Sequence, residues 1–100
     1  MLNSRQRAQL RSIGTGLDTI LQIGKGGITE NVVAQADSAL TAREIIKGRV
    51  LEASMLTARE ACDELCGLVR AEPVQVIGTK FVIYRENHSI PKEKRIKLVK

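Results

Sequence analysis

Apolar residues recur with the spacing of a helix in three parts of the chain. Each part follows a residue that can cap a helix, namely Asn3 or Ser4, Thr29, and Thr57. Thr57 and Glu60 also have the spacing of a capping box, in which each side chain bonds the backbone amide of the other residue. We therefore predict three helices. Their inward-facing residues would be Leu10, Ile13 and Leu17, then Ile28, Val32, Val33, Ala36 and Leu40, then Ala58, Ala61, Cys62, Leu65, Leu68 and Val69.

Shorter apolar segments between and after these helices have the character of strands. They cover residues 20–23, 45–51, 74–77 and 80–85. Gly14 and Gly16 are expected to end the first helix, and Pro73 excludes continuation of the third. Gly78 and Thr79 form a two-residue connection, which predicts a hairpin between the last two strands.

The second strand has a mixed pattern. Lys47 and Arg49 fall on one face and Ile46 and Val50 on the other, which indicates a half-exposed strand. Gly48 stands where a β-branched residue would be expected. It weakens the strand, or it marks a bulge or a close approach of another part of the chain.

The element order is α-β-α-β-α-β-β, which predicts a compact α/β sandwich with a mixed sheet of about four strands and three helices. The connections 23–45 and 51–74 are long enough for parallel pairing, whereas 74–85 must be antiparallel. We expect one domain over residues 1–85 and a basic tail over 86–100, which could add an edge strand or stay mobile.

A glycine loop joins the first strand to the second helix. Gly24, Gly26 and Gly27 let the backbone approach a ligand, Lys25 adds a cation at the tip, and the helix that follows directs free amides toward the loop. These features predict phosphate binding, and a plain strand-to-helix turn is the alternative. The Walker pattern fails because the lysine precedes the glycine pair, and the Rossmann fingerprint fails too.

The formal net charge is +5, and it is unevenly distributed. Residues 1–27 carry +3 and residues 76–100 carry +5, whereas residues 28–75 carry −3. This segregation predicts a basic face that binds a polyanion, with nucleic acid as the first candidate, although charge scattered for solubility would give a similar total. The flanking cations that could contact phosphate, or could simply be solvated, are Arg5, Arg7, Arg11, Lys80 and Arg85.

An enzyme is the competing class, but the chain offers little for catalysis. His88 is the single histidine, in a polar loop without a cysteine or paired carboxylates near it in sequence. Cys62 and Cys66 could supply two metal ligands, yet a structural zinc site needs four, so buried thiols are the better reading. We expect no catalytic residues, metal, cofactor or small-molecule substrate.

Composition limits which other classes of protein this chain could belong to. Phe81 and Tyr84 are the only aromatic residues, so the core must be aliphatic and no base-stacking platform is available. Tyr84 itself is expected to pack in the sheet. The start of the chain lacks the apolar region of a secretion signal, and no apolar run could span a bilayer. We expect a cytoplasmic protein that is monomeric when free and does not bind membranes.

Three ordered pieces of the sequence, residues 17–30, 43–47 and 74–85, resemble the YhbY-like proteins. These are the bacterial stand-alone form of the CRM domain, the chloroplast RNA splicing and ribosome maturation module. The resemblance implies a fold similar to the C-terminal domain of translation initiation factor three. It also implies RNA binding, and in bacteria a role with precursors of the large ribosomal subunit. The family's G-x-x-G loop corresponds to Gly24, Lys25, Gly26 and Gly27. Residues 86–100 follow the family only loosely.

The resemblance and the loop together suggest a mechanism. The loop amides and Lys25 would clamp the backbone of unpaired RNA, much as a KH loop does, and a side chain at Gly26 would block the approach. A protein-interaction module is the alternative, in which the acidic third helix, with Glu60, Asp63 and Glu64, docks a basic ribosomal protein or assembly factor.

Overall fold

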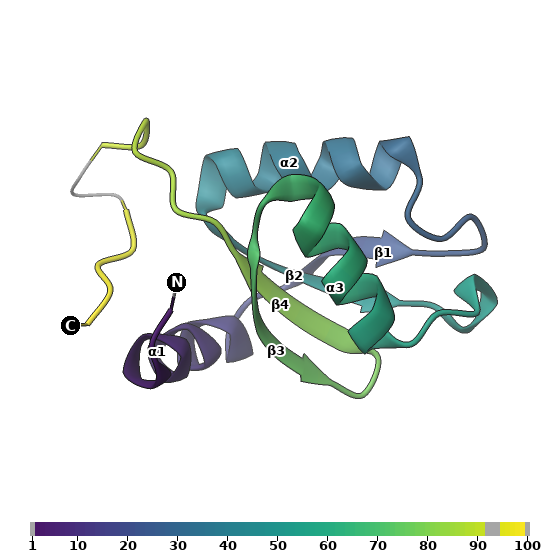
Figure 1. Ribbon diagram of the computed structural model, residues 1–100, viewed down its shortest axis with the longest axis horizontal. Helices are drawn as coiled ribbons and strands as arrows, with labels where there is room; N and C mark the ends of the chain where they lie inside the picture. Colours follow the sequence, from purple (N-terminus) through teal and green to yellow (C-terminus); the bar gives the residue numbers. More distant parts are fainter. Residues whose placement is uncertain (1, 92–94, 100) are drawn as a thin grey trace.

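The computed structural model describes residues 2–91 and 95–99. Within them the chain forms three α-helices and one four-stranded sheet (Figure 1). In order, the elements are α1 (Ser4–Thr15), β1 (Thr19–Ile23), α2 (Glu30–Arg43), β2 (Ile45–Val50), the 3-10 turn η1 (Glu52–Ser54), α3 (Ala58–Val69), β3 (Glu72–Ile77) and β4 (Lys80–Tyr84). The predicted element order and mixed sheet are confirmed.

The strands are arranged β1-β2-β4-β3, so β4 lies between β2 and β3. β1 and β2 are parallel, and both pairs that contain β4 are antiparallel. The crossover through α3 therefore runs to the far edge of the sheet and does not produce a neighbouring parallel strand. Pro73 has no amide proton to donate, and β3 is an edge strand, where this loss is tolerated.

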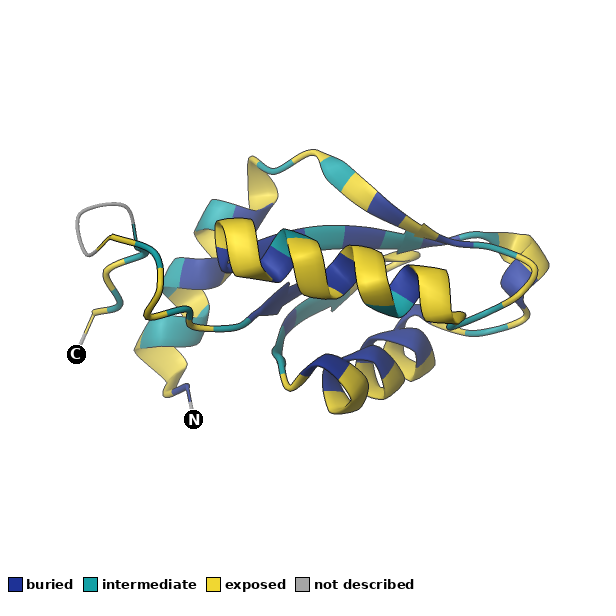
Figure 2. Cartoon of the chain, turned by 90° about the horizontal axis from the view of Figure 1, so that it is seen from above, coloured by how far each residue is buried: buried dark blue, intermediate teal, exposed yellow. Residues whose placement is uncertain are grey.

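Alternation along the strands divides the core into two layers. Ile46, Val50, Phe81 and Ile83 pack with α2 and α3 on one face of the sheet. On the opposite face a smaller cluster packs with α1, and it consists of Leu2, Leu10, Ile45, Val74, Val82 and Tyr84. Figure 2 shows the buried residues of α2 and α3 as stripes along otherwise exposed helices. The molecule therefore has α1 on one side of the sheet and two helices on the other.

The predicted caps are confirmed. The Asn3 side chain accepts a bond from the Gln6 amide at 2.8 Å, Thr29 accepts one from Val32 at 3.2 Å, and Thr57 accepts one from Glu60 at 3.1 Å. Glu60 also accepts a bond from the Thr57 amide at 2.9 Å, which completes the predicted capping box.

Two details of the helices differ from the predictions. Gly14 does not end α1, because the helix continues to Thr15 and Gly16 is its C-cap. A Cβ at Gly14 would lie 3.0 Å from Cγ2 of Val82, so glycine lets α1 pack close to the sheet. Leu68 was expected in the core but is 56% exposed, and the inward position of that turn is taken by Cys66.

At Gly48 another part of the chain approaches β2 closely, which was one of the predicted explanations for a glycine in this strand. It pairs in register with Phe81, and a Cβ at Gly48 would lie 2.5 Å from the end of the Phe81 ring. The ring therefore occupies the space that a side chain on β2 would fill, which buries the one phenylalanine of the chain beneath α2 and α3.

The described part of the tail forms no strand. Residues 95–99 return along α1, where Gln9 donates to the Lys97 carbonyl at 2.8 Å and accepts from the Val99 amide at 2.8 Å. Ile96 and Leu98 pack against the α1 cluster. The other residues of the predicted basic tail, 92–94 and 100, lie outside the described residues.

Candidate functional site

The loop after β1 is a tight turn held by its own backbone. The Gly27 amide donates to the Gly24 carbonyl at 2.9 Å, and Gly27 has a φ of +69°, which favours glycine. Lys25 and Gly26 at the tip are exposed, whereas Gly24 and Gly27 are half-buried. The loop is therefore open to a ligand and not covered by other parts of the described chain.

The glycines of the loop have different reasons to be glycine. A Cβ at Gly26 would lie 2.8 Å from Cγ2 of Thr29, the residue that caps α2, so a side chain there would displace Thr29 and disturb the cap. Gly24 has no such constraint, because its φ is not positive and a Cβ would meet only Leu51 at 3.8 Å. A requirement for glycine at position 24 would therefore come from outside the chain.

Electrostatics around the loop are mixed. The N-terminus of α2 follows directly, and the free amides of its first turn carry a partial positive charge that favours an anion. Lys25 adds a full charge. Two exposed acids lie close by, Glu30 in the first turn of α2 and Glu52 in the neighbouring connection that packs on the loop through Leu51.

The same end of the sheet carries further cations. The Val50 amide donates to the Thr79 carbonyl at 2.8 Å, which places the β3–β4 turn beside the end of β2. Lys80 pairs in register with Arg49, and Arg49 pairs with Gln22 just before the glycine loop. The loop and Lys80 thus belong to one end of the molecule (Figure 1).

Arg5, Arg7 and Arg11 are not part of that end. They lie on α1, and both views place α1 toward the opposite end of the long axis from the glycine loop (Figures 1 and 2). The molecule extends 39 Å along this axis. Arg5 and Arg11 are exposed, whereas Arg7 is half-buried beside Pro73 and Gln75. The predicted cations therefore form two separate groups.

Arg85 is tied into the structure. Its guanidinium donates to Oδ1 of Asp37 at 2.8 Å and to the Asp37 carbonyl at 3.0 Å. It also donates to Oγ1 of Thr41 at 2.9 Å and to the Val69 carbonyl at 2.9 Å. These bonds join the middle of α2 to the end of α3. Four of the five guanidinium N–H groups can be assigned to partners inside the chain.

The structure places two further cations, Lys47 and Arg49, beside Lys80, which was one of the predicted RNA contacts. Lys47, Arg49 and Lys80 lie on the face of the sheet that carries α1, beyond the end of that helix. The described residues contain two ion pairs, Arg85 with Asp37 and His88 with Glu86, and neither involves this group. The alternation of β2 had already placed Lys47 and Arg49 on one face, and β4 supplies the third cation.

The two cysteines and the single histidine were the other side chains considered for catalysis or metal binding. Cys62 and Cys66 are buried, and a hydrogen bond from Cys66 lowers the pKa of Cys62 while the same bond raises the pKa of Cys66. His88 is exposed and lies between Glu86, with Nε2 to Oε1 at 3.0 Å, and Arg95. No cluster of three or more metal-ligating side chains occurs in residues 2–91 and 95–99.

None of the helices in these described residues is long and apolar enough to cross a membrane.

Comparison with known proteins places the chain in a family. Residues 2–85 match the model of the CRS1 / YhbY (CRM) domain, so the chain belongs to that family. It is 38% identical over 87 residues to "Probable RNA-binding protein YqeI" of Bacillus subtilis, which covers 87% of this chain and 91% of the relative. It is 37% identical over 86 residues to "Probable RNA-binding protein PA4753" of Pseudomonas aeruginosa, covering 86% and 83%.

A solved structure has the same fold. The solution structure of SAV1595 from Staphylococcus aureus, described as a hypothetical protein and candidate RNA-binding protein, matches with a TM-score of 0.77. The two chains are 40% identical, and the match covers 99% of this chain and 100% of the other. The predicted family and fold class are confirmed.

Proposed function

We propose that this chain is an RNA-binding protein whose primary contact is the G-x-x-G loop at residues 24–27. The observation that carries the proposal is the exposed turn itself, with Lys25 at its tip and the N-terminus of α2 behind it. Membership of the CRM family and the names of the relatives support the same ligand.

The loop would hold the sugar-phosphate backbone. Its amides and those of the first turn of α2 donate to phosphate oxygens, Lys25 neutralises charge, and Gly24 permits close approach. Lys80 extends the contact from the same end of the sheet. We leave Arg85 out of this surface because its guanidinium is already bonded to α2 and α3.

Arg5, Arg7 and Arg11 would form a second contact. Because α1 begins toward the other end of the 39 Å long axis, an RNA that contacts both Arg5 and the loop must follow much of the length of the protein. Arg11, by contrast, lies one turn before Thr15, which lines a hollow together with Lys80. We therefore expect substitution of Arg5 to weaken binding to long structured RNA and to leave binding to short oligonucleotides unchanged.

We further propose that the target is ribosomal RNA of the large subunit or of its precursor, bound in the cytoplasm by a monomeric protein that assists maturation and catalyses no reaction. This target is the one that the resemblance to the YhbY-like proteins implies. The lack of an aromatic platform favours recognition of RNA shape over reading of a base sequence by stacking.

The test compares Lys25→Glu with Arg43→Glu, which reverses an exposed charge in the last turn of α2. We expect Lys25→Glu to weaken binding of 23S rRNA fragments at least about tenfold in a salt titration and Arg43→Glu to have little effect. Sedimentation of cell extract should place the wild-type protein with large-subunit precursors. Equal affinity of wild type and Lys25→Glu would refute the site.

A second candidate function is docking on a protein. Leu68 on α3 is exposed, and an apolar hollow between α2 and α3 lies under it, beside Asp37 and Glu30. A basic ribosomal protein or assembly factor could bind this acidic side while RNA occupies the loop. Charge reversal at Glu60 and Glu64 would abolish such docking and leave RNA affinity intact.

A further inference from the structure

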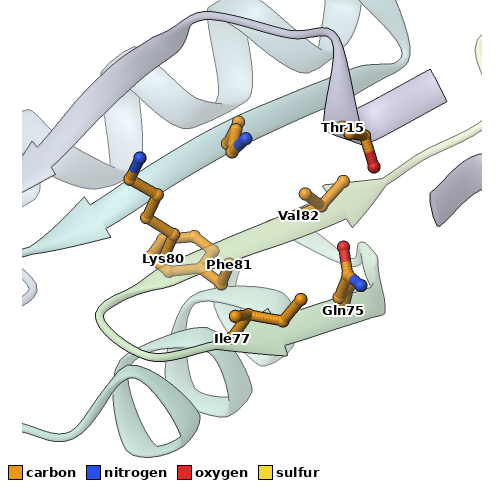
Figure 3. A pocket seen from close by; sticks show the side chains of 7 residues that line it. Thr15, Gln75, Ile77, Lys80, Phe81 and Val82 are labelled. Atoms are coloured by element: carbon orange, nitrogen blue, oxygen red, sulfur yellow. The ribbon is translucent and has the colours of Figure 1, made fainter. Parts of the chain in front are cut away.

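The face of the sheet that carries α1 is only half covered. α1 ends at Thr15, and beyond it the strands carry the exposed side chains of Ile77 and Lys80. Figure 3 shows these residues together with Thr15 and Val82. A hollow of about 160 Å³ lies at this boundary. Its lining includes Thr15, Lys47, Gln75, Ile77, Lys80 and Val82.

Strand register explains how the hollow is built. Val82 on β4 is flanked by Lys47 on β2 and Gln75 on β3, and residues directly opposite each other point to the same face. In the next row toward the glycine loop, Lys80 is flanked by Arg49 and Ile77. Each row therefore combines an aliphatic side chain with at least one cation.

The row that contains Lys80 is unfavourable without a ligand. Like charges directly opposite on neighbouring strands destabilise a sheet, and Arg49 and Lys80 are such a pair. No carboxylate within the described residues forms an ion pair with either one. A backbone phosphate, which carries one negative charge, would lie between the two cations and offset their repulsion.

The row that contains Val82 has a different chemistry. Val82 itself is only 2% exposed because it packs beneath α1, so the apolar surface open to a ligand is the neighbouring Ile77, which is 63% exposed. The Gln75 amide, the Thr15 hydroxyl and the Lys47 amine line the same hollow. No hydrogen bond of the Gln75 side chain is formed with the described residues. A nucleobase has the matching combination of a flat apolar face and a polar edge, whereas a phosphate has no apolar face to place on Ile77.

We propose that this hollow receives one unpaired RNA base, with the adjoining phosphate between Lys80 and Arg49. The inference rests on the RNA binding proposed above and extends it from the loop to the sheet. β1 leads from this face to the glycine loop, and β4 lies two strand spacings from β1, or roughly 10 Å. A single strand held at Lys25 could therefore continue across the sheet into the hollow.

The first test measures the contribution of the base. The probe is a labelled oligouridylate of about twelve nucleotides, compared with a ribose-phosphate oligomer of the same length without bases. We expect loss of the bases to weaken binding to wild type about tenfold. In Ile77→Asp this difference should fall to about twofold, whereas Leu68→Asp, an equivalent change of an exposed leucine on α3, should retain it.

The second test separates a binding role from a structural one. Lys80→Thr removes the like-charge pair, so its urea midpoint should equal or exceed that of wild type while its affinity for the oligouridylate falls about fivefold. Photocrosslinking with 4-thiouridine should label residues 75–82 in addition to the loop.

The outcomes distinguish this inference from the proposed function. If base-free and base-bearing oligomers bind equally, or crosslinks occur only at residues 24–30, the hollow is not a base site although the loop still binds RNA. If wild type binds neither the oligouridylate nor rRNA fragments, the proposed function fails, and this inference fails with it. Equal loss of affinity in Ile77→Asp and Leu68→Asp would also refute the proposal that the hollow binds a base.

Discussion

The glycine loop at one end of the molecule and the region around Arg85 and Glu44 at the other use their charged residues in different ways. At the loop end, Lys25 is exposed and no ion pair of the described residues includes it. At the other end, Arg85 and Glu44 are bonded to backbone and side chains of several elements. Glu44 accepts from the Asn87 amide at 2.8 Å and from the Ile96 amide at 2.8 Å. A charge is available to a ligand only where the fold has not already given it partners.

The largest effect is expected at Glu44. Its side chain is buried, and Glu44→Ala would leave two amides without their charged acceptor. We expect the free energy of unfolding to fall by about 3 kcal/mol and the affinity of the folded protein for RNA to stay unchanged. Urea denaturation measures the first quantity and fluorescence anisotropy the second. Glu64→Ala, at an exposed position of α3, is the control and should change neither.

Arg85→Met is the next in size and separates the two ends most directly. The substitution keeps much of the aliphatic stem but removes four hydrogen bonds. Stability should fall by about 2 kcal/mol, and RNA affinity should remain that of wild type. A loss of affinity in fully folded Arg85→Met would show that Arg85 contacts RNA in spite of its bonds to α2 and α3.

Lys25→Ala should give the opposite result. The side chain is exposed at the loop tip, so stability should change by less than about 0.5 kcal/mol. Affinity for RNA should fall about fivefold, and the slope of log affinity against log salt should become shallower by about 0.7 to 0.9. An unchanged slope in the salt titration would mean that Lys25 contacts no phosphate.

Gly24→Ala tests whether RNA approaches the backbone of the glycine loop. The added methyl group has ordinary packing space, so the chain should be as stable as wild type or slightly more stable. If RNA approaches the backbone here, affinity should fall about threefold nonetheless. Gly26→Ala is a poorer probe, since it also disturbs Thr29 and the cap of α2. Wild-type affinity in Gly24→Ala would place the RNA farther from the turn.

The smallest effect under ordinary conditions concerns Tyr84. Burial, followed by the nearby Glu44, raises the pKa of Tyr84 to about 12 from its usual value of 10. The folded state therefore favours the protonated phenol, and this contribution is complete below pH 10 and is lost as the pH rises toward 12. An absorbance titration of the single tyrosine should show the shift, and the urea midpoint should decline over the same interval.

Local patterns in the sequence were sufficient for the elements but not for every side chain. The caps at Asn3, Thr29 and Thr57 and the turn at Gly78 have short-range causes, so they could be predicted. Leu68 kept the helical period yet lies outside the core. Its exposure depends on where α3 meets α2, which the period of a single helix does not specify.

Only part of the candidate site could likewise be predicted from local sequence. The loop is contiguous in sequence, and its turn could be predicted from Gly24 and Gly27. The grouping of cations could not, because it depends on which strands become neighbours. Lys80 and Arg49 come together only through insertion of β4 beside β2, and Arg85 finds Asp37 across 48 positions of the chain. Net charge along the sequence gave no sign of either pairing.

The central place of β4 has a consequence for synthesis of the protein. β2 can pair with β1 as soon as residue 50 has left the ribosome, but its other edge stays open until residues 80–84 emerge. During that interval the nascent chain presents unpaired amides and carbonyls of an apolar strand, which is a template for wrong pairing. Closure of the sheet is therefore a late event, and a translational pause between residues 50 and 80 would prolong the exposure of this edge.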